Sequence, residues 1–454
     1  MRLSPANHVT IMIPAMRIYP PYPEPNLYFC FCSFSLTKAC ETLHRSIKYV
    51  FINMYRLHSE SGFYLNKLCR AISDRSVGSE GNRRATRFFE RTVSSLGWRT
   101  ENSELSVIDW RDGGASLRAG NLGFEVYASP YSLGCSVEAP LARISNIDEL
   151  KEKRVKGKII LLSGEIANEQ LMPKNFVFYN PEEHKEIIAL LEAKQPAAII
   201  TATGRNASLA GGAYPFPLIE DGDFDIPSVY MTDKEGERLL RLEGMPVILE
   251  SKSERIPSKA YNITARKGAS DDRIVLTAHI DAKKGTPGAI DNATGVVCLL
   301  LLAELLSDYE GGKTLEIAAL NGEDYYAVPG QMDYIRMNRN SFGNIRLNIN
   351  IDGAGYREGK TVFSMFDLSS DMREKIDEVM NEFKDITEGI RWPQGDHSIF
   401  IQQGCPAIAV SSQWFTEHME SQEITHTPKD SAEIVDLRKV VEIAQALNRF
   451  IRKI

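Results

Sequence analysis

The chain has 454 residues, of which 43% are hydrophobic and 25% are charged, and its formal net charge is −7. This length allows two or more domains, and this composition supports a large core and excludes a disordered protein. Because the sequence contains no run of about 18 apolar residues and no basic cluster, we expect no membrane span and no nucleic-acid partner.

The first 53 residues differ in character from the rest of the chain. They contain several prolines and three cysteines, and they show no helix or strand pattern. The apolar stretch at residues 27–36 lacks the preceding basic run and the small-residue cleavage site of a signal peptide. We therefore predict a poorly structured N-terminal extension at residues 1–53, and we interpret it as foreign to a native protein that starts at Met54.

A change in the apolar pattern divides the remaining chain into two predicted domains. Residues 65–98 favour two helices, because apolar side chains recur at helical spacing until Gly97 interrupts them. Short apolar strands around one helix then follow, and longer strands alternate with helices after residue 250. We expect a main domain at residues 54–117 and 251–454, and an inserted, smaller α/β or mainly-β domain at residues 118–250.

Strands that alternate with helices in the main domain predict a mostly parallel mixed sheet flanked by helices. The predicted strands of this domain are residues 261–265, 273–278, 314–320 and 345–351, and its predicted helices include residues 296–306 and 436–451. In the insert the predicted strands are residues 157–162, 197–201 and 227–230, and the predicted helix is residues 182–191.

An acidic run, residues 220–225, lies near the end of the insert. Its spacing of acids suggests a calcium loop, but it lacks the glycine at the sixth place and the glutamate at the twelfth place of that loop. We interpret it as a solvated acidic loop.

Six short polar motifs follow one another in the second half of the chain. Each motif alone is weak, since His and Asp are ordinary residues, but the ordered set supplies five metal ligands and one acid/base. The motifs are His279-Ile280-Asp281, Asp291-Asn292, Glu323-Asp324, Asp352-Gly353, Asp396-His397 and His426-Thr427-Pro428.

The ligand types in these motifs predict a pair of divalent metal ions. Such a pair needs one shared ligand, and a carboxylate can bridge two ions where a neutral imidazole cannot. We expect Asp291 to be the bridge, with His279 and Asp352 at the first ion and Asp324 and His426 at the second. Imidazole and carboxylate without thiolate suit zinc first, with cobalt or manganese as alternatives.

Three further acids have predicted roles around these ions. Glu323 is the predicted general base, because a positioned glutamate can take a proton from water and return it to a leaving amine. Asp281 lies two residues after His279, so we expect it to orient that imidazole. Asp430 could orient its loop or cap the following helix, and we favour the cap.

This ordered set resembles the zinc exopeptidase family of bacterial leucyl aminopeptidases, aminopeptidase Y and glutamate carboxypeptidase. The family pattern is His-x-Asp, Gly-Ala-x-Asp-Asn, Gly-Glu-Glu, Asp-x-x-Gly, Asp-His and His-Thr, and the resemblance covers roughly residues 60–454. It implies a phosphorylase/hydrolase-like catalytic fold, and it implies that the insert is a protease-associated domain that covers the cleft. One departure is Asp324, which stands where the family usually has glutamate.

We expect a two-zinc exopeptidase that acts on peptides, most simply an aminopeptidase. The alternatives are a carboxypeptidase or dipeptidase of the same family, a glutaminyl cyclase, and a binding protein on a peptidase scaffold. A carboxypeptidase needs a cation for the terminal carboxylate, and Arg391 is a candidate that we interpret as structural. The sequence leaves the oligomeric state open.

The cysteines after residue 53 are scattered and lack the spacing of a disulfide framework. This pattern suits a reducing compartment. We expect a cytoplasmic location, with secretion as the alternative.

Overall fold

The structure is a computed structural model that describes residues 54–72, 74–204, 214–419, 421 and 423–454. The predicted N-terminal extension, residues 1–53, lies outside these residues. In the described part of the chain no helix has both the length and the apolar character to cross a membrane.

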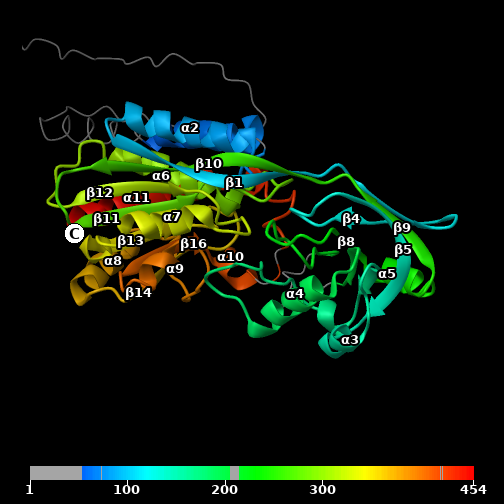
Figure 1. The fold of residues 1–454 in the computed structure, drawn as a ribbon. Helices are drawn as coiled ribbons and strands as arrows, with labels where there is room; N and C mark the ends of the chain where they lie inside the picture. The colour runs from blue at the N-terminus through cyan, green and yellow to red at the C-terminus, as the bar shows by residue number, and fades with distance from the viewer. Residues whose placement is uncertain (1–53, 73, 205–213, 420, 422) are drawn as a thin grey trace, which may run out of the picture. The chain divides into compact units, whose positions relative to one another are not determined.

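The first sheet contains eight strands of the described residues, in the order β1-β10-β12-β11-β13-β16-β14-β15 (Figure 1). The strands β12, β11, β13 and β16 run parallel at its centre, while β10 and β14 pair with them antiparallel, so the predicted mostly parallel mixed sheet is confirmed. Their bounds are β1 Arg99–Arg111, β10 Glu254–Lys267, β11 Arg273–His279, β12 Thr314–Leu320, β13 Ile345–Ile351, β14 Thr361–Phe366, β15 Ile386–Glu388 and β16 Ala407–Ser412.

Helices cover both faces of this sheet because its central strands are buried on both sides. Side chains alternate along β11, so Ile274 and Leu276 pack in one core cluster with α6 and α11, and Val275 packs in another with α7 and α9. Residues 54–66 are also helical. The other bounds are α2 Glu80–Ser95, α6 Thr294–Leu305, α7 Pro329–Asn338, α8 Ser370–Asn381, α9 His397–Ile401, α10 Gln413–His418 and α11 Leu437–Lys453.

The second sheet is built from residues between β1 and β10, in the order β3-β2-β9-β5-β6-β7-β8-β4. The identity of this segment as a protease-associated domain stays a prediction. Its strands are β2 Ala115–Ala119, β3 Leu122–Phe124, β4 Tyr127–Ala128, β5 Cys135–Ile144, β6 Ile159–Leu162, β7 Ala198–Thr203, β8 Ser228–Thr232 and β9 Pro246–Ser251. Its helices are α3 Ile147–Glu152, α4 Glu182–Lys194 and α5 Asp233–Leu240.

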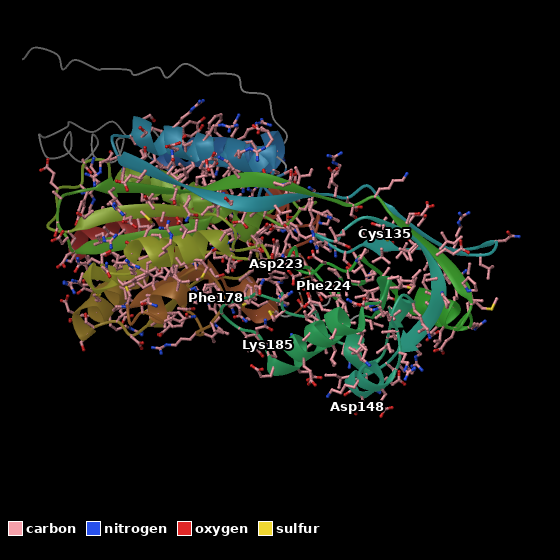
Figure 2. The ribbon with its side chains drawn as sticks, viewed as in Figure 1. Cys135, Asp148, Phe178, Lys185, Asp223 and Phe224 are labelled. Atoms are coloured by element: carbon pink, nitrogen blue, oxygen red, sulfur yellow. The ribbon has the colours of Figure 1, made fainter. Side chains whose placement is uncertain are left out.

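The acidic run at residues 220–225 is not the solvated loop that its composition predicts. Asp221 is buried, and its two carboxylate oxygens accept the backbone N–H groups of Lys174 and Asp223. Phe224, labelled with Asp223 in Figure 2, lies in the core of the second sheet. Asp221 stays in the interior because backbone amides satisfy its carboxylate, which composition alone does not reveal, whereas Asp225 is exposed.

The functional motifs gather where the parallel strands end. His279 is the last residue of β11, Glu323 and Asp324 follow β12, and Asp352 follows β13 directly. Since β11 pairs in parallel with both β12 and β13, these carboxyl ends meet at one edge of the sheet. Open α/β sheets place their sites at this edge.

Candidate metal centre

The loop that carries Asp291 is held from two sides. The buried guanidinium of Arg75 donates to the backbone carbonyls of Ile280, Pro287 and Gly288, so it fixes the loop between β11 and α6. Asp430 closes the other side, because its carboxylate accepts the backbone N–H groups of the loop at residues 290 and 291. The predicted capping role of Asp430 is wrong, since Asp436 caps α11.

The loop that carries Asp324 is fixed by amides and by Asp281. The side chains of Asn82 and Asn321 exchange two hydrogen bonds of 2.9 Å each. The Asp281 carboxylate accepts the backbone N–H groups of Gly322 at 2.7 Å and Asp324 at 3.0 Å. Asp281 therefore orients the second acidic motif as well as lying beside His279.

The predicted contact between Asp281 and His279 is looser than expected. The Nδ1 atom of His279 lies 3.6 Å from Oδ1 of Asp281, which is longer than a hydrogen bond. The strand ends at His279, so the strict alternation that suggested a direct bond no longer applies to Asp281.

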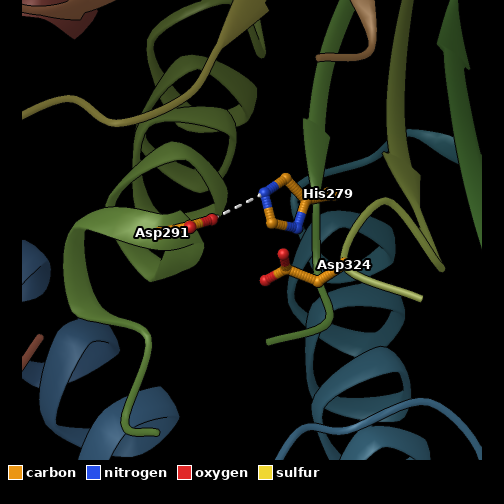
Figure 3. A group of neighbouring side chains, drawn as sticks. All are labelled: His279, Asp291 and Asp324. Atoms are coloured by element: carbon orange, nitrogen blue, oxygen red, sulfur yellow. Dashed lines mark ion pairs between the residues drawn. The ribbon is translucent and has the colours of Figure 1, made fainter. Parts of the chain in front are cut away.

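The five predicted ligands lie together, with Asp291 between the two imidazoles. The Nε2 atom of His279 lies 3.1 Å from Oδ1 of Asp291 and 3.5 Å from Oδ1 of Asp352. The Nε2 atom of His426 lies 3.1 Å from the other oxygen of Asp291 and 2.9 Å from Oδ1 of Asp324. Figure 3 shows the Asp291 carboxylate facing the His279 ring, with Asp324 below the ring.

The electrostatics of the cluster favour a cation at both imidazoles. Burial alone would lower the pKa of His279, but the carboxylates of Asp352, Asp281 and Asp291 outweigh it and raise that pKa well above its usual value. The pKa of His426 is raised in the same way, against burial, by Asp324 and Asp291. Burial alone would raise the pKa of Asp291, but the neighbouring imidazoles of His279 and His426 outweigh it and lower that pKa.

Backbone strain accompanies this geometry at His426. Its φ is 59°, in the left-handed region that a side chain rarely occupies. Such a conformation costs on the order of 1–2 kcal/mol and is concentrated at functional sites. The strain aims the imidazole at the shared carboxylate.

Two more acids border the ligand cluster. Burial, with the charges of Asp324 and Asp352, raises the pKa of Glu323 well above its usual value. Burial also raises the pKa of Asp396 to about 7, and Gln331 donates a 2.7 Å hydrogen bond to one of its oxygens. The neighbouring His397 ring contacts the carbonyl of Trp392 at 2.9 Å, so its role is to brace the loop.

The cluster fits divalent cations on the chemistry of its donors. Among the described residues, buried atoms of the site that find no hydrogen-bond partner include both ring nitrogens of His279, Oδ2 of Asp324 and Oδ1 of Asp352. One ligand atom each from His279, Asp291 and Asp324 lies within 4.8 Å of the others. Unpartnered buried polar atoms are rare, and a bound cation accounts for this group.

Some residues near the site could not be identified from the sequence. Lys283 follows Asp281 by two residues, and its Nζ lies 2.7 Å from Oε1 of Glu220 in the acidic run of the insert. Arg391 instead donates to the carbonyl of Met365 and lies over the Phe366 ring, as its structural interpretation implies. Lys283 and Glu220 lie 63 positions apart in the sequence, and no sequence pattern indicates their pairing.

Comparisons with known proteins find relatives of this sequence and this fold. Residues 262–451 match the family model described as Peptidase family M28. A curated relative, probable leucine aminopeptidase 2 of Aspergillus oryzae, is 22% identical over 62% of this chain and 54% of its own length. The chain spans about half the length of the curated relatives it matches.

Solved structures share the fold over most of the chain. The aminopeptidase from Aneurinibacillus sp. strain AM-1 matches with a TM-score of 0.66 at 20% identity, over 87% of this chain and 93% of its own. A zinc aminopeptidase from Bacillus subtilis matches with a TM-score of 0.65 at 17% identity, over 87% of this chain and 94% of its own. Residues 262–451 therefore resemble peptidase family M28.

Proposed function

We propose that this chain is a two-zinc exopeptidase, and specifically an aminopeptidase that removes N-terminal residues from peptides. The observation that carries the proposal is the place of Asp291, whose two oxygens each lie 3.1 Å from a different imidazole nitrogen. The relatives and solved neighbours are named as aminopeptidases, one of them as a zinc enzyme, which supports the same activity here.

The ligands divide into two sites that share Asp291. His279 and Asp352 would complete one site, and Asp324 and His426 the other. The shorter Asp324 reaches His426 to 2.9 Å, so the missing methylene relative to glutamate does not remove it from the cluster. Divalent ions held there supply Lewis-acid chemistry, which acidifies water and polarises the scissile carbonyl.

Glu323 supplies the proton transfers of the reaction. Its carboxylate accepts a proton from the attacking water as the water oxygen bonds to the scissile carbonyl carbon. It then gives that proton to the amine nitrogen as the carbon–nitrogen bond breaks, so the carboxylate is restored. Burial raises the pKa of Glu323, which favours its holding the proton between the two transfers.

The surplus of acids around the ligands favours a substrate with a free ammonium. Glu323 and Asp396 are carboxyl groups outside the ligand set, and Oδ2 of Asp396 has no hydrogen-bond partner among the described residues. A peptide N-terminus would place its ammonium one carbon away from the scissile carbonyl, close to these acids.

Two measurements on the full chain, purified without chelators, test the proposal. Elemental analysis should find about two zinc ions per chain, both lost in the double variant His279→Ala/His426→Ala. Leucine p-nitroanilide should be hydrolysed, while its N-acetylated counterpart should not. Cleavage of both substrates, or of neither after zinc is added, would contradict the aminopeptidase assignment, and a single ion would contradict the paired centre.

A further inference from the structure

Lys283 places a cation beside the candidate metal centre. It lies in the loop after β11, two residues beyond Asp281, and its ammonium contacts the Glu220 carboxylate at 2.7 Å. Burial alone would lower the pKa of Lys283, but Glu220 and Asp324 outweigh it and raise that pKa, with a further contribution from Glu323. The charges of the acidic motif that follows β12 thus act on this ammonium and favour its charged form.

The partner of Lys283 is held rigidly by the surrounding chain. The second oxygen of Glu220 accepts a 3.2 Å hydrogen bond from the side chain of Gln170. Two residues further on, Gly222 lies so close to Tyr326 that a Cβ there would meet the ring at 2.4 Å. Arg255 on β10 also binds the run, through a 2.7 Å contact with Asp225. Glu220 can therefore fix the position of the Lys283 ammonium.

The ammonium of Lys283 keeps donors for another group. A lysine ammonium carries three N–H donors, and within the described residues Glu220 accepts the one hydrogen bond that the Lys283 ammonium donates. A quarter of the Lys283 side chain is exposed, as is 29% of the His426 side chain. The remaining N–H donors of Lys283 thus belong to a side chain that is partly exposed to solvent near the ligand cluster.

If the ion pair between Lys283 and Glu220 were purely structural, it would not need to lie near the proposed metal ligands. A cation close to Asp324 repels the divalent ions proposed for the same acid, and it repels a substrate ammonium. For an anionic substrate group the repulsion becomes an attraction. Such a group would accept a charge-assisted hydrogen bond from the Lys283 ammonium, which Glu220 already holds in place.

We propose that Lys283 binds a carboxylate of the peptide substrate and makes this chain selective for substrates that carry one near the scissile bond. The inference rests on the proposed exopeptidase function and names its substrate class. The carboxylate has two sources: the α-carboxylate of a dipeptide, or an acidic side chain next to the scissile bond. Glu220 acts through Lys283, so it is a positioning residue contributed by the insert.

Matched substrates test this selectivity without relying on absolute rates. Leu-Gly is compared with Leu-Gly amide for the α-carboxylate, and Glu-p-nitroanilide with Gln-p-nitroanilide for the side chain. In the native sequence we expect kcat/KM to favour the charged member of one pair by about tenfold or more, the scale of one charge-assisted hydrogen bond. Lys283→Met should bring that ratio close to one, and Lys283→Arg should retain part of it.

Two further variants distinguish a loss of selectivity from a folding defect. Lys283→Met leaves Glu220 without its cation, so Lys283→Met/Glu220→Gln removes both charges and should lose the same preference while melting as a folded protein. Lys284→Met is the matched control, since Lys284 bonds to Asp109 and Trp110 and should leave the ratio unchanged.

The outcomes separate this inference from the aminopeptidase proposal. Hydrolysis of both members of a pair, with a ratio that Lys283→Met does not alter, would overturn the role of Lys283 and leave the peptidase intact. A chain with bound zinc that cleaves none of the four substrates would overturn the peptidase, and the carboxylate selectivity with it. The product of the preferred charged substrate, glycine from Leu-Gly or glutamate from Glu-p-nitroanilide, cannot be hydrolysed further. Its binding, followed by calorimetry, should weaken in Lys283→Met but not in Lys284→Met.

Discussion

The carboxylate of Asp430 accepts the backbone N–H of Asp291 at 3.1 Å and that of Ile290 at 2.8 Å. The backbone carbonyl of Asp430 also accepts the N–H of Ala289 at 3.2 Å. The segment that ends in Asp430 also carries His426. A single residue therefore ties the loop of the proposed bridging ligand to the loop of the second imidazole.

Replacing Asp430 should weaken metal binding. In Asp430→Ala the two backbone N–H groups before and at the bridging carboxylate lose their acceptors, so the orientation of Asp291 relaxes. Loss of such an outer partner costs about 10–100-fold in metal affinity, and zinc competition against a chromogenic chelator would measure it. Asp430→Asn keeps one carbonyl oxygen as an acceptor. Its zinc affinity should therefore lie between that of the native protein and that of Asp430→Ala.

The control for this change is Asp436→Ala. Asp436 caps α11 through a 2.9 Å bond from the N–H of Arg438, away from the ligands. Its loss should cost about 1 kcal/mol of unfolding free energy and leave zinc affinity unchanged. Native zinc affinity in Asp430→Ala would refute the coupling.

The variant Glu323→Gln should retain zinc and lose turnover. Glutamine has the shape of glutamate but cannot accept the proton of the attacking water, so kcat should fall by at least 100-fold. Zinc content and melting temperature should match the native protein, since Glu323 is outside the proposed ligand set. Rates within about threefold of the native value, well short of that loss, would rule out Glu323 as the general base.

The central strands could be predicted from the sequence because they are buried on both faces. Residues 314–320 are an apolar run interrupted by Glu316, and in residues 345–351 an apolar residue recurs at every second place. These two ranges coincide with β12 and β13. In contrast, β1 alternates between exposed and buried residues and carries five charged side chains in Arg99–Arg111, so its length was not predicted. Strand β10 extends beyond the predicted residues 261–265 for the same reason.

The residues that surround the ligand cluster could not be predicted as well as its members. The ligand motifs repeat a recognisable order, but Arg75 and Asp430 act through backbone groups of distant residues, which leave no side-chain pattern. Asp281 was expected to contact His279 alone, whereas its carboxylate holds two N–H groups of the next acidic loop. Such contacts depend on tertiary packing across the ends of several strands.

Substitution of Gly222 should loosen the insert where it meets the loop after β12. A Cβ at this residue would lie 2.4 Å from Cζ and Oη of Tyr326, so either the run at residues 220–225 or the ring must move. We expect Gly222→Ala to lower the unfolding free energy by about 1–3 kcal/mol, measured by chemical denaturation. Gly123→Ala is the control, because nothing lies within 4 Å of its added Cβ. Equal stability of the two variants would contradict the close packing of this run.

A pair of carboxyl groups should make stability depend on pH. Burial, together with neighbouring Glu60, raises the pKa of Glu304 from 4.5 to about 7, while Arg56 partly offsets the shift. Between these pH values the folded protein keeps a proton that the unfolded chain has released. Stability from this group is therefore complete below about pH 4.5 and is lost as the pH rises through 7.

Glu304→Gln should remove this penalty because the amide carries no charge at any pH. Its melting temperature should exceed that of the native protein by about 2 °C or more at pH 8, and the difference should shrink or reverse at pH 4.5, where the native carboxyl keeps its proton. The exposed Glu310, five residues beyond the end of α6, provides the control Glu310→Gln, whose difference from the native protein should not vary with pH in this way. A Glu304→Gln difference that is the same at both pH values would show that the carboxyl pair does not hold the proton.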